Sequence, residues 1–89
     1  DQETLLEAIQ FQKQVIRRYP NDTHHHLELA QLYELLGEKK SMQDSVLKAE
    51  ELNSINKKHG HTDRVFTPQE QEILLKLKAI VGENPNKSE

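Results

Sequence analysis

The placement of glycine and proline constrains the fold of this chain more strongly than any other feature of its sequence. All six of these residues lie outside the apolar segments that repeat with a helical period: Pro20, Gly37, Gly60, Pro68, Gly82 and Pro85. Because Gly and Pro both destabilise a helix interior, they mark helix ends. The pattern predicts an all-α fold with about four helices, over residues 2–19, 23–36, 39–54 and 68–81. We expect one domain over residues 1–82 with a loop at 53–66, followed by a disordered tail at 83–89.

Two of these helices begin at residues that can cap them. Asp22 or Thr23 can accept a hydrogen bond from the first free N–H groups of the second helix. Thr67 followed by Glu70 is typical of a capping box for the last helix, and Pro68 suits the first helical position. The start of the last helix is therefore the best-defined boundary in the sequence.

Small, aromatic and glycine residues occur in a fixed order within residues 23–54. The positions that define this order are Leu29, Ala30, Tyr33, Gly37 and Ala49. Their order and spacing resemble one tetratricopeptide repeat, a helix-turn-helix unit of 34 residues. Ahead of this segment, Ala8 and Pro20 resemble the second helix of a preceding repeat and the junction that follows it.

The resemblance to the tetratricopeptide family implies antiparallel helix hairpins, arranged as a fragment of a right-handed solenoid. It covers about one and a half repeats, and the last helix is expected to cap the array. It also implies a non-enzymatic scaffold or interaction module, which we expect to be the C-terminal part of a longer repeat protein. An ordinary antiparallel four-helix domain is the alternative.

One face of the second helix is expected to bind a partner protein or peptide. The face combines apolar and polar side chains at helical spacing, namely His24, Leu27, Gln31, Glu34 and Leu35. The resemblance implies that it lines the concave side of the array, where such a mixture suits an extended or helical peptide. The alternatives are a mixed solvent face, or a seam that a neighbouring repeat covers.

Three consecutive histidines, His24, His25 and His26, raise the question of a metal site. Consecutive residues point in different directions on a helix, and no second pair at ligand spacing accompanies them. We therefore expect no metal site. We place His26 at the hairpin interface and the other two histidines in solvent.

We do not expect catalysis or a cofactor. The sequence contains no Gly-rich phosphate loop, no Ser/His/Asp order and no carboxylate pair that indicates acid–base chemistry. A histidine phosphotransfer bundle is a less favoured alternative. The three histidines lack the His-x-x-Lys-Gly pattern of that family.

Charge and composition exclude several classes of partner. The chain has 12 Lys and Arg against 15 Asp and Glu, and no basic tract that could neutralise phosphates or anionic lipid. We therefore expect no nucleic-acid binding. No apolar run approaches the roughly 20 residues of a membrane span, so no membrane insertion is expected. The absence of Cys excludes disulfides and leaves the compartment open.

Self-association is the second functional hypothesis. The first helix carries more apolar side chains than one neighbouring helix can cover, Leu6 and Phe11 among them. Exposed apolar surface of this kind tends to recruit a partner. A homo-oligomer formed through the first helix is therefore the alternative to a peptide-binding module.

Overall fold

The computed structural model describes residues 1–82 and shows a helical chain. Its elements are α1 (Gln2–Arg18), α2 (Thr23–Leu36), α3 (Lys39–Lys58), the 3₁₀ helix η1 (Thr62–Arg64) and α4 (Pro68–Gly82). No strand forms within the described residues, so the predicted all-α class and the four predicted α-helices are confirmed. The disorder expected at 83–89 concerns residues outside the described range.

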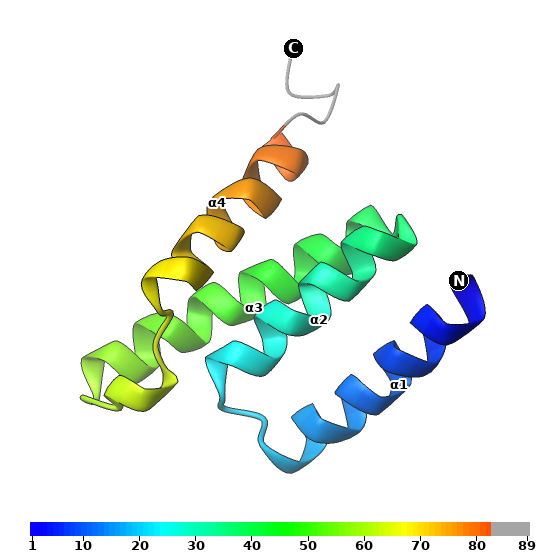
Figure 1. Cartoon of the computed structure of the whole chain (residues 1–89). Coiled ribbons are helices and arrows are strands. Elements are labelled where there is room, and N and C mark those ends of the chain that lie inside the picture. The colour runs from blue at the N-terminus through cyan, green and yellow to red at the C-terminus, as the bar shows by residue number, and fades with distance from the viewer. Residues whose placement is uncertain (83–89) are drawn as a thin grey trace.

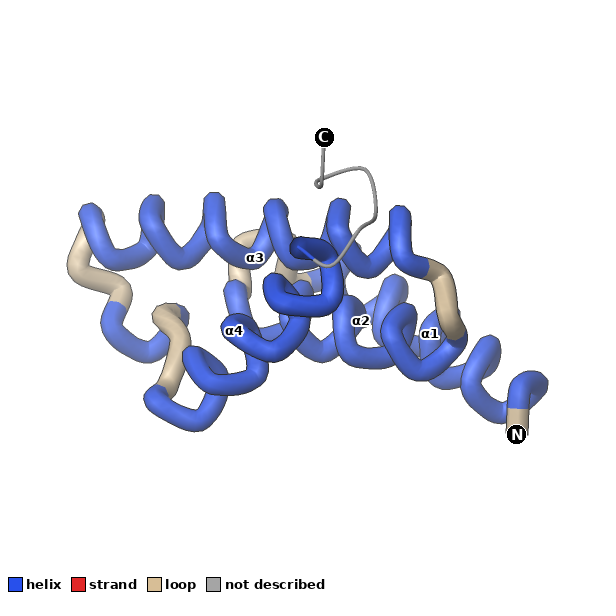
Figure 2. The backbone as a smooth tube through the Cα atoms, turned by 90° about the horizontal axis from the view of Figure 1, so that it is seen from above, coloured by secondary structure: helices blue, strands red, loops and turns tan. Residues whose placement is uncertain are grey.

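Helix α2 is the centre of the molecule. It packs against α1, α3 and α4. α1 runs antiparallel to α2, and α2 runs antiparallel to α3 (Figure 1). α4 packs on both α2 and α3 and leans away from α2 toward its own C-terminal end (Figure 1). In the view from above, α3 lies along one edge, with the other helices on the same side of it (Figure 2).

The main core lies where α2, α3 and α4 meet. Its buried members are Leu27, Ala30, Met42, Val46, Ala49, Phe66, Leu74 and Leu77. Ala30 and Ala49 have no exposed surface, and their small side chains allow α2 and α3 to approach closely. Each leucine buried here stabilises the fold by about 1.5–3 kcal/mol. Outside this cluster, α1 has one buried residue, Ile9.

The helix ends follow the capping residues closely. Of the two candidates for α2, Asp22 is the N-cap, and its Oδ1 accepts from the backbone N–H of His24 at 3.0 Å. Gly37 ends α2 with a φ of 87°, which is a left-handed conformation that favours glycine. At α4, the N–H of Glu70 donates to Thr67 Oγ1 and the N–H of Thr67 donates to Glu70 Oε1. The predicted capping box is therefore confirmed.

Helix α3 continues to Lys58, beyond its predicted end. Asn53 and Asn56 are poor helix formers, and for that reason the sequence indicates an earlier boundary. In the structure both side chains bond to backbone beyond the helix, and Asn53 Oδ1 accepts from the N–H of Phe66 at 2.8 Å. These hydrogen bonds stabilise the last turns of α3. The loop predicted over 53–66 is therefore wrong in its first part, and its second part includes η1.

Candidate functional site

The helices α2 and α4 diverge toward the C-terminal end of α4 (Figure 1). An open groove lies between them. It has a volume of about 330 Å³. We call it the α2–α4 groove, and its lining residues are Gln31, Glu34, Leu35, Ile73, Lys76, Leu77 and Ile80. The first three belong to the C-terminal half of α2, and the other four belong to α4.

The packing of α4 explains why the bottom of the α2–α4 groove is apolar. Leu77 is 4% exposed and belongs to the core. Ile73 and Ile80 are half-buried and pack against the same core. On the α2 side, Leu35 is 69% exposed at the rim. A partner with an apolar face can therefore contact four aliphatic side chains in one place.

The two sides of the groove carry opposite charges. Glu34 is an exposed anion on α2, and Lys76 is an exposed cation on α4. Among residues 1–82, neither side chain takes part in an ion pair. Both charges are thus available to a partner, and their opposite signs give the groove a positive and a negative side.

The structure divides the predicted partner-binding face into two parts. Gln31, Glu34 and Leu35 line the groove. Leu27, expected on the same partner-binding face, is instead 1% exposed and belongs to the core, so it is not accessible to a partner. His24 lies outside the groove, at the start of α2, and contacts Glu70. α4 covers the first half of this face and leaves only the second half open.

Sequence reasoning missed the side of the groove that α4 provides. It treated the last helix as a cap over the core. The spacing of Ile73, Leu77 and Ile80 at i, i+4 and i+7, beside the exposed Lys76, was the signal that could have indicated a second lining helix.

The residues that carry the family resemblance occupy varied environments. Leu29, Ala30 and Ala49 are buried, and Ala8 and Tyr33 are half-buried. Pro20 and Gly37 are exposed in the turns before and after α2. The ammonium group of Lys13 lies 6.0 Å from the centre of the Tyr33 ring. Ala30 and Ala49 thus pack within the α2–α3 hairpin, whereas the contact of Lys13 with Tyr33 joins α1 to α2.

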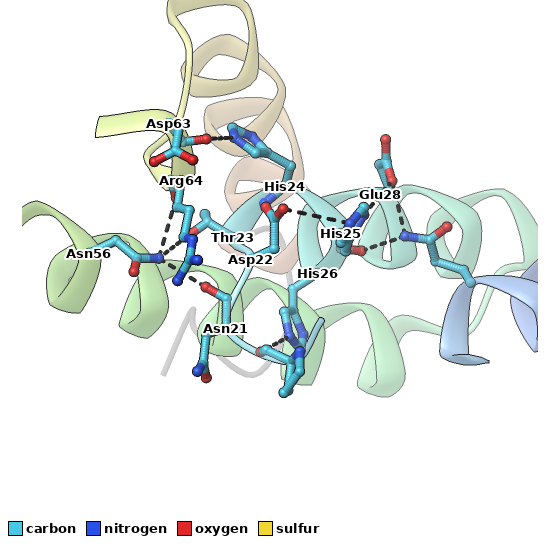
Figure 3. A network of polar contacts seen from close by, with 12 residues as sticks. Asn21, Asp22, Thr23, His24, His25, His26, Glu28, Asn56, Asp63 and Arg64 are labelled. Carbon is cyan, nitrogen blue, oxygen red and sulfur yellow. Dashed lines mark hydrogen bonds and ion pairs between the residues drawn. The ribbon is translucent and has the colours of Figure 1, made fainter. Parts of the chain in front are cut away.

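A second feature at the start of α2 is a network of polar contacts around the histidines (Figure 3). His24 is not in free solvent as predicted, since its side chain is only 24% exposed. Its Nδ1 lies 2.8 Å from both carboxylate oxygens of Glu70. Its Nε2 lies 2.9 Å from the backbone oxygen of Asp63 (Figure 3). One imidazole therefore joins α2, η1 and α4.

The surroundings of His24 and His26 shift their pKa values in opposite directions. Burial lowers the pKa of His24, but the hydrogen bonds to Asp63 and Glu70 and the charges of Glu70 and Asp22 outweigh it, so the pKa is raised. For His26, burial is the main effect and lowers the pKa, although the ring lies 3.0 Å from the backbone oxygen of Pro20. The predicted burial of His26 is confirmed by its 8% exposure.

Asn56 anchors the other side of this network. Its Nδ2 donates toward the backbone oxygens of Asn21 and Arg64 and toward Thr23 Oγ1, at distances of 3.0–3.4 Å (Figure 3). Asn56 is 2% exposed and Thr23 is fully buried. The amide thus ties the end of α3 to the start of α2 and to η1. No buried side-chain nitrogen or oxygen lacks a hydrogen bond within the described residues.

Comparisons with protein-family models, with curated proteins and with solved structures gave no match. No helix within residues 1–82 combines the length and the apolar character that a membrane span requires. The same part of the chain brings no three His, Cys, Asp or Glu side chains together as metal ligands.

Proposed function

We propose that this chain is a non-enzymatic protein-interaction module that binds an amphipathic helical segment of a partner in the α2–α4 groove. The observation that carries the proposal is the apolar bottom of the groove between two oppositely charged sides. A helix lying in a groove between two helices buries its apolar face and keeps its polar face in water. The module is thus a scaffold surface, and no catalytic step is assigned to it.

The groove defines the chemistry of the partner segment. Residues 31–35 and 73–80 supply its two sides, and eight helical residues span about 12 Å. The partner segment therefore needs about two turns of helix with an apolar strip. A cation beside that strip would face Glu34, and an anion on the other edge would face Lys76.

The tetratricopeptide resemblance remains part of this proposal. α2 and α3 would form one repeat hairpin, with Ala30 and Ala49 at its crossing, and α4 would be the capping helix. The zero exposure of both alanines supports close packing of this hairpin. Under this assignment the α2–α4 groove would be the binding surface at the end of an array.

Synthetic helical peptides provide a direct test of the groove. The probe is a labelled amphipathic peptide of at least two helical turns. It carries Lys on one edge of its apolar strip and Glu on the other. Its affinity is measured by fluorescence anisotropy. Leu35→Glu should weaken binding at least about tenfold, which corresponds to about 1.4 kcal/mol. Leu75→Glu is the matched control, because Leu75 is 65% exposed on α4 outside the groove.

A charge variant tests the sidedness of the groove. Glu34→Lys makes both sides basic, so it should weaken the mixed-charge peptide and favour a peptide with Glu on both edges. The expected change is about two- to fivefold, because exposed charge pairs contribute about 0.2–1 kcal/mol. Equal affinity of the native protein, Leu35→Glu and Leu75→Glu for every peptide would reject the groove as the binding site.

Self-association through α1 is a second candidate function. Leu6 and Phe11 are 45% and 65% exposed on this helix. The first turn of α1 contains Glu3, and its last turn contains Arg17 and Arg18. Two copies of α1 packed antiparallel would bring the acidic end of each helix to the basic end of the other.

A further inference from the structure

The ring of His24 is held by two acceptors from two different elements. On one side, both oxygens of the Glu70 carboxylate lie 2.8 Å from Nδ1. On the other side, the backbone oxygen of Asp63 lies 2.9 Å from Nε2. A carboxylate and a carbonyl oxygen both accept hydrogen bonds and cannot donate one.

This geometry distinguishes the two protonation states of the ring. A neutral imidazole has one N–H and one nitrogen lone pair, so it can donate to only one of the two acceptors. Its other nitrogen would face an oxygen lone pair at 2.8–2.9 Å, which is repulsive. An imidazolium donates from both nitrogens at once. The contacts of His24 are therefore those of a protonated ring, and charge strengthens the one to the carboxylate.

Glu70 links the ring to the start of α4. One of the two Glu70 oxygens that contact His24, Oε1, also accepts from the backbone N–H of Thr67 at 2.9 Å. The backbone N–H of Glu70 in turn donates to Thr67 Oγ1 at 3.1 Å. The His24 ring thus binds the same carboxylate that caps α4. A change at His24 acts directly on the first turn of this helix.

We propose that protonation of His24 is a switch that fixes the first turn of α4 and η1 against α2. In the protonated state the ring donates to both Glu70 and Asp63. On deprotonation one of these hydrogen bonds is lost, and the first turn of α4 or the η1 segment is released from α2. The switch requires no ligand and no change elsewhere in the chain.

The charged groups around the ring favour the protonated state. From α4 the ring faces Glu70, and at the N-terminal end of α2 it faces Asp22. η1 supplies the Asp63 backbone oxygen and also carries the charged side chains of Asp63 and Arg64. Burial opposes the charge, but the hydrogen bonds and the two carboxylates outweigh it, and the pKa of His24 lies above 6.5. The stabilisation of α4 by protonated His24 is therefore fully present below pH 6.5, and it is lost as the pH rises through the raised pKa of His24.

Regulation of the α2–α4 groove follows if the proposed function is correct. α4 forms one side of the groove, and His24 fixes α4 at the end where it meets α2. Release of the first turn would change the spacing of the two sides. Partner affinity should then fall as His24 loses its proton. This last step rests on the proposed function, whereas the switch itself does not.

The switch is tested on the whole chain without any partner. The chemical shifts of the histidine ring protons are followed by NMR as the pH is varied, in the native protein and in Glu70→Gln. This variant keeps a capping-box side chain but removes its charge. We expect His24 to titrate above 6.5 in the native protein and clearly lower in Glu70→Gln. Glu72→Gln is the matched control, because Glu72 is exposed on the same helix. A His24 that titrates at or below 6.5 in the native protein would overturn the proposal.

Amide hydrogen exchange of residues 62–72, which include η1 and the first turn of α4, supplies the conformational readout. Relative to amides in the middle of α3, their protection should fall several-fold as the pH rises through the titration of His24. In Glu70→Gln and in His24→Asn this fall should be absent. The same fall in all variants, or no fall in the native protein, would reject the switch.

Peptide affinity at pH 6 and pH 8 then tests the coupling of the switch to the α2–α4 groove. A confirmed switch with pH-independent binding would reject only the coupling, and a peptide that never binds would reject only the proposed function.

Discussion

The side-chain amide of Asn56 donates to the hydroxyl oxygen of Thr23 across 3.1 Å, inside the hairpin formed by α2 and α3. Both residues are buried, and the same amide nitrogen also lies within hydrogen-bond distance of two backbone oxygens. A polar side chain in such a place stabilises the fold only while its partners are present. Asn56 therefore specifies how the end of α3 meets the start of α2.

Asn56→Ala should lower the free energy of unfolding by about 1–3 kcal/mol. The variant leaves the buried Thr23 hydroxyl and two partly buried backbone oxygens without their donor. Buried polar groups that lose a hydrogen-bond partner usually cost this much. Chemical denaturation followed by circular dichroism measures the change. Ser54→Ala is the control, since Ser54 is exposed on the same helix, and it should stay within about 0.5 kcal/mol. Equal stability of the two variants would contradict the role of Asn56.

Two leucines on α2 have opposite surroundings, one in the core and one at the rim of the groove. Leu27 is 1% exposed and Leu35 is 69% exposed. Leu27→Ala should therefore cost about 2–5 kcal/mol of stability by leaving a cavity. Leu35→Ala should change stability by less than about 0.5 kcal/mol. Thermal or denaturant unfolding of both variants decides the assignment. A destabilisation of similar size in both would mean that α4 does not cover Leu27 as described.

Much of the helical structure was predictable because its signals are local. Gly37 in a left-handed conformation and the Thr67–Glu70 capping box act within a few residues of the sequence, and both function as expected. The predicted end of α3 failed for the opposite reason. Asn56 is a poor helix former locally, and hydrogen bonds to residues up to 35 positions away stabilise it in the helix.

The candidate site was predictable only in part, since it depends on where α4 docks. The helical spacing of Gln31, Glu34 and Leu35 shows that they share a face, but it does not show which part of that face another helix covers. The same limit applies to His24. Its acceptors on Asp63 and Glu70 lie 39 and 46 positions away, so no sequence pattern around the histidines indicates them.

Protonation of His26 should destabilise the folded protein at acidic pH. Burial lowers its pKa from 6.5, so the folded state binds the proton less readily than the unfolded state. The sign is opposite to that of His24. Its stabilising contribution is fully present above pH 6.5 and is lost as the pH falls below 6.5 through the lowered pKa.

The variant His26→Gln removes this titration. Measured at pH 8, it should be less stable than the native protein, because the ring packs in the hairpin and lies 3.0 Å from the Pro20 oxygen. The difference should narrow as the pH falls from 7 to 5. Free energies of unfolding at several pH values provide the test, with His61→Gln as an exposed control. A difference that stays constant with pH would contradict the effect of burial.

Self-association can be distinguished from peptide binding by the surface that it uses. Leu6 and Phe11 lie on α1, and no residue of α1 lines the α2–α4 groove. Association through α1 should therefore leave the groove open. Sedimentation velocity over a broad range of concentrations should show a concentration-dependent dimer.

The double variant Leu6→Glu with Phe11→Glu should remove this dimer by placing charges in the contact. Leu47→Glu with Ile55→Glu is the matched control, since these residues of α3 are 57% and 44% exposed. High salt should also weaken the dimer, because the antiparallel arrangement pairs Glu3 with the arginines at the other end of α1 and salt screens such exposed charges. A native chain that stays monomeric at every concentration would reject self-association. A dimer that both double variants disrupt equally would place its interface elsewhere than on α1.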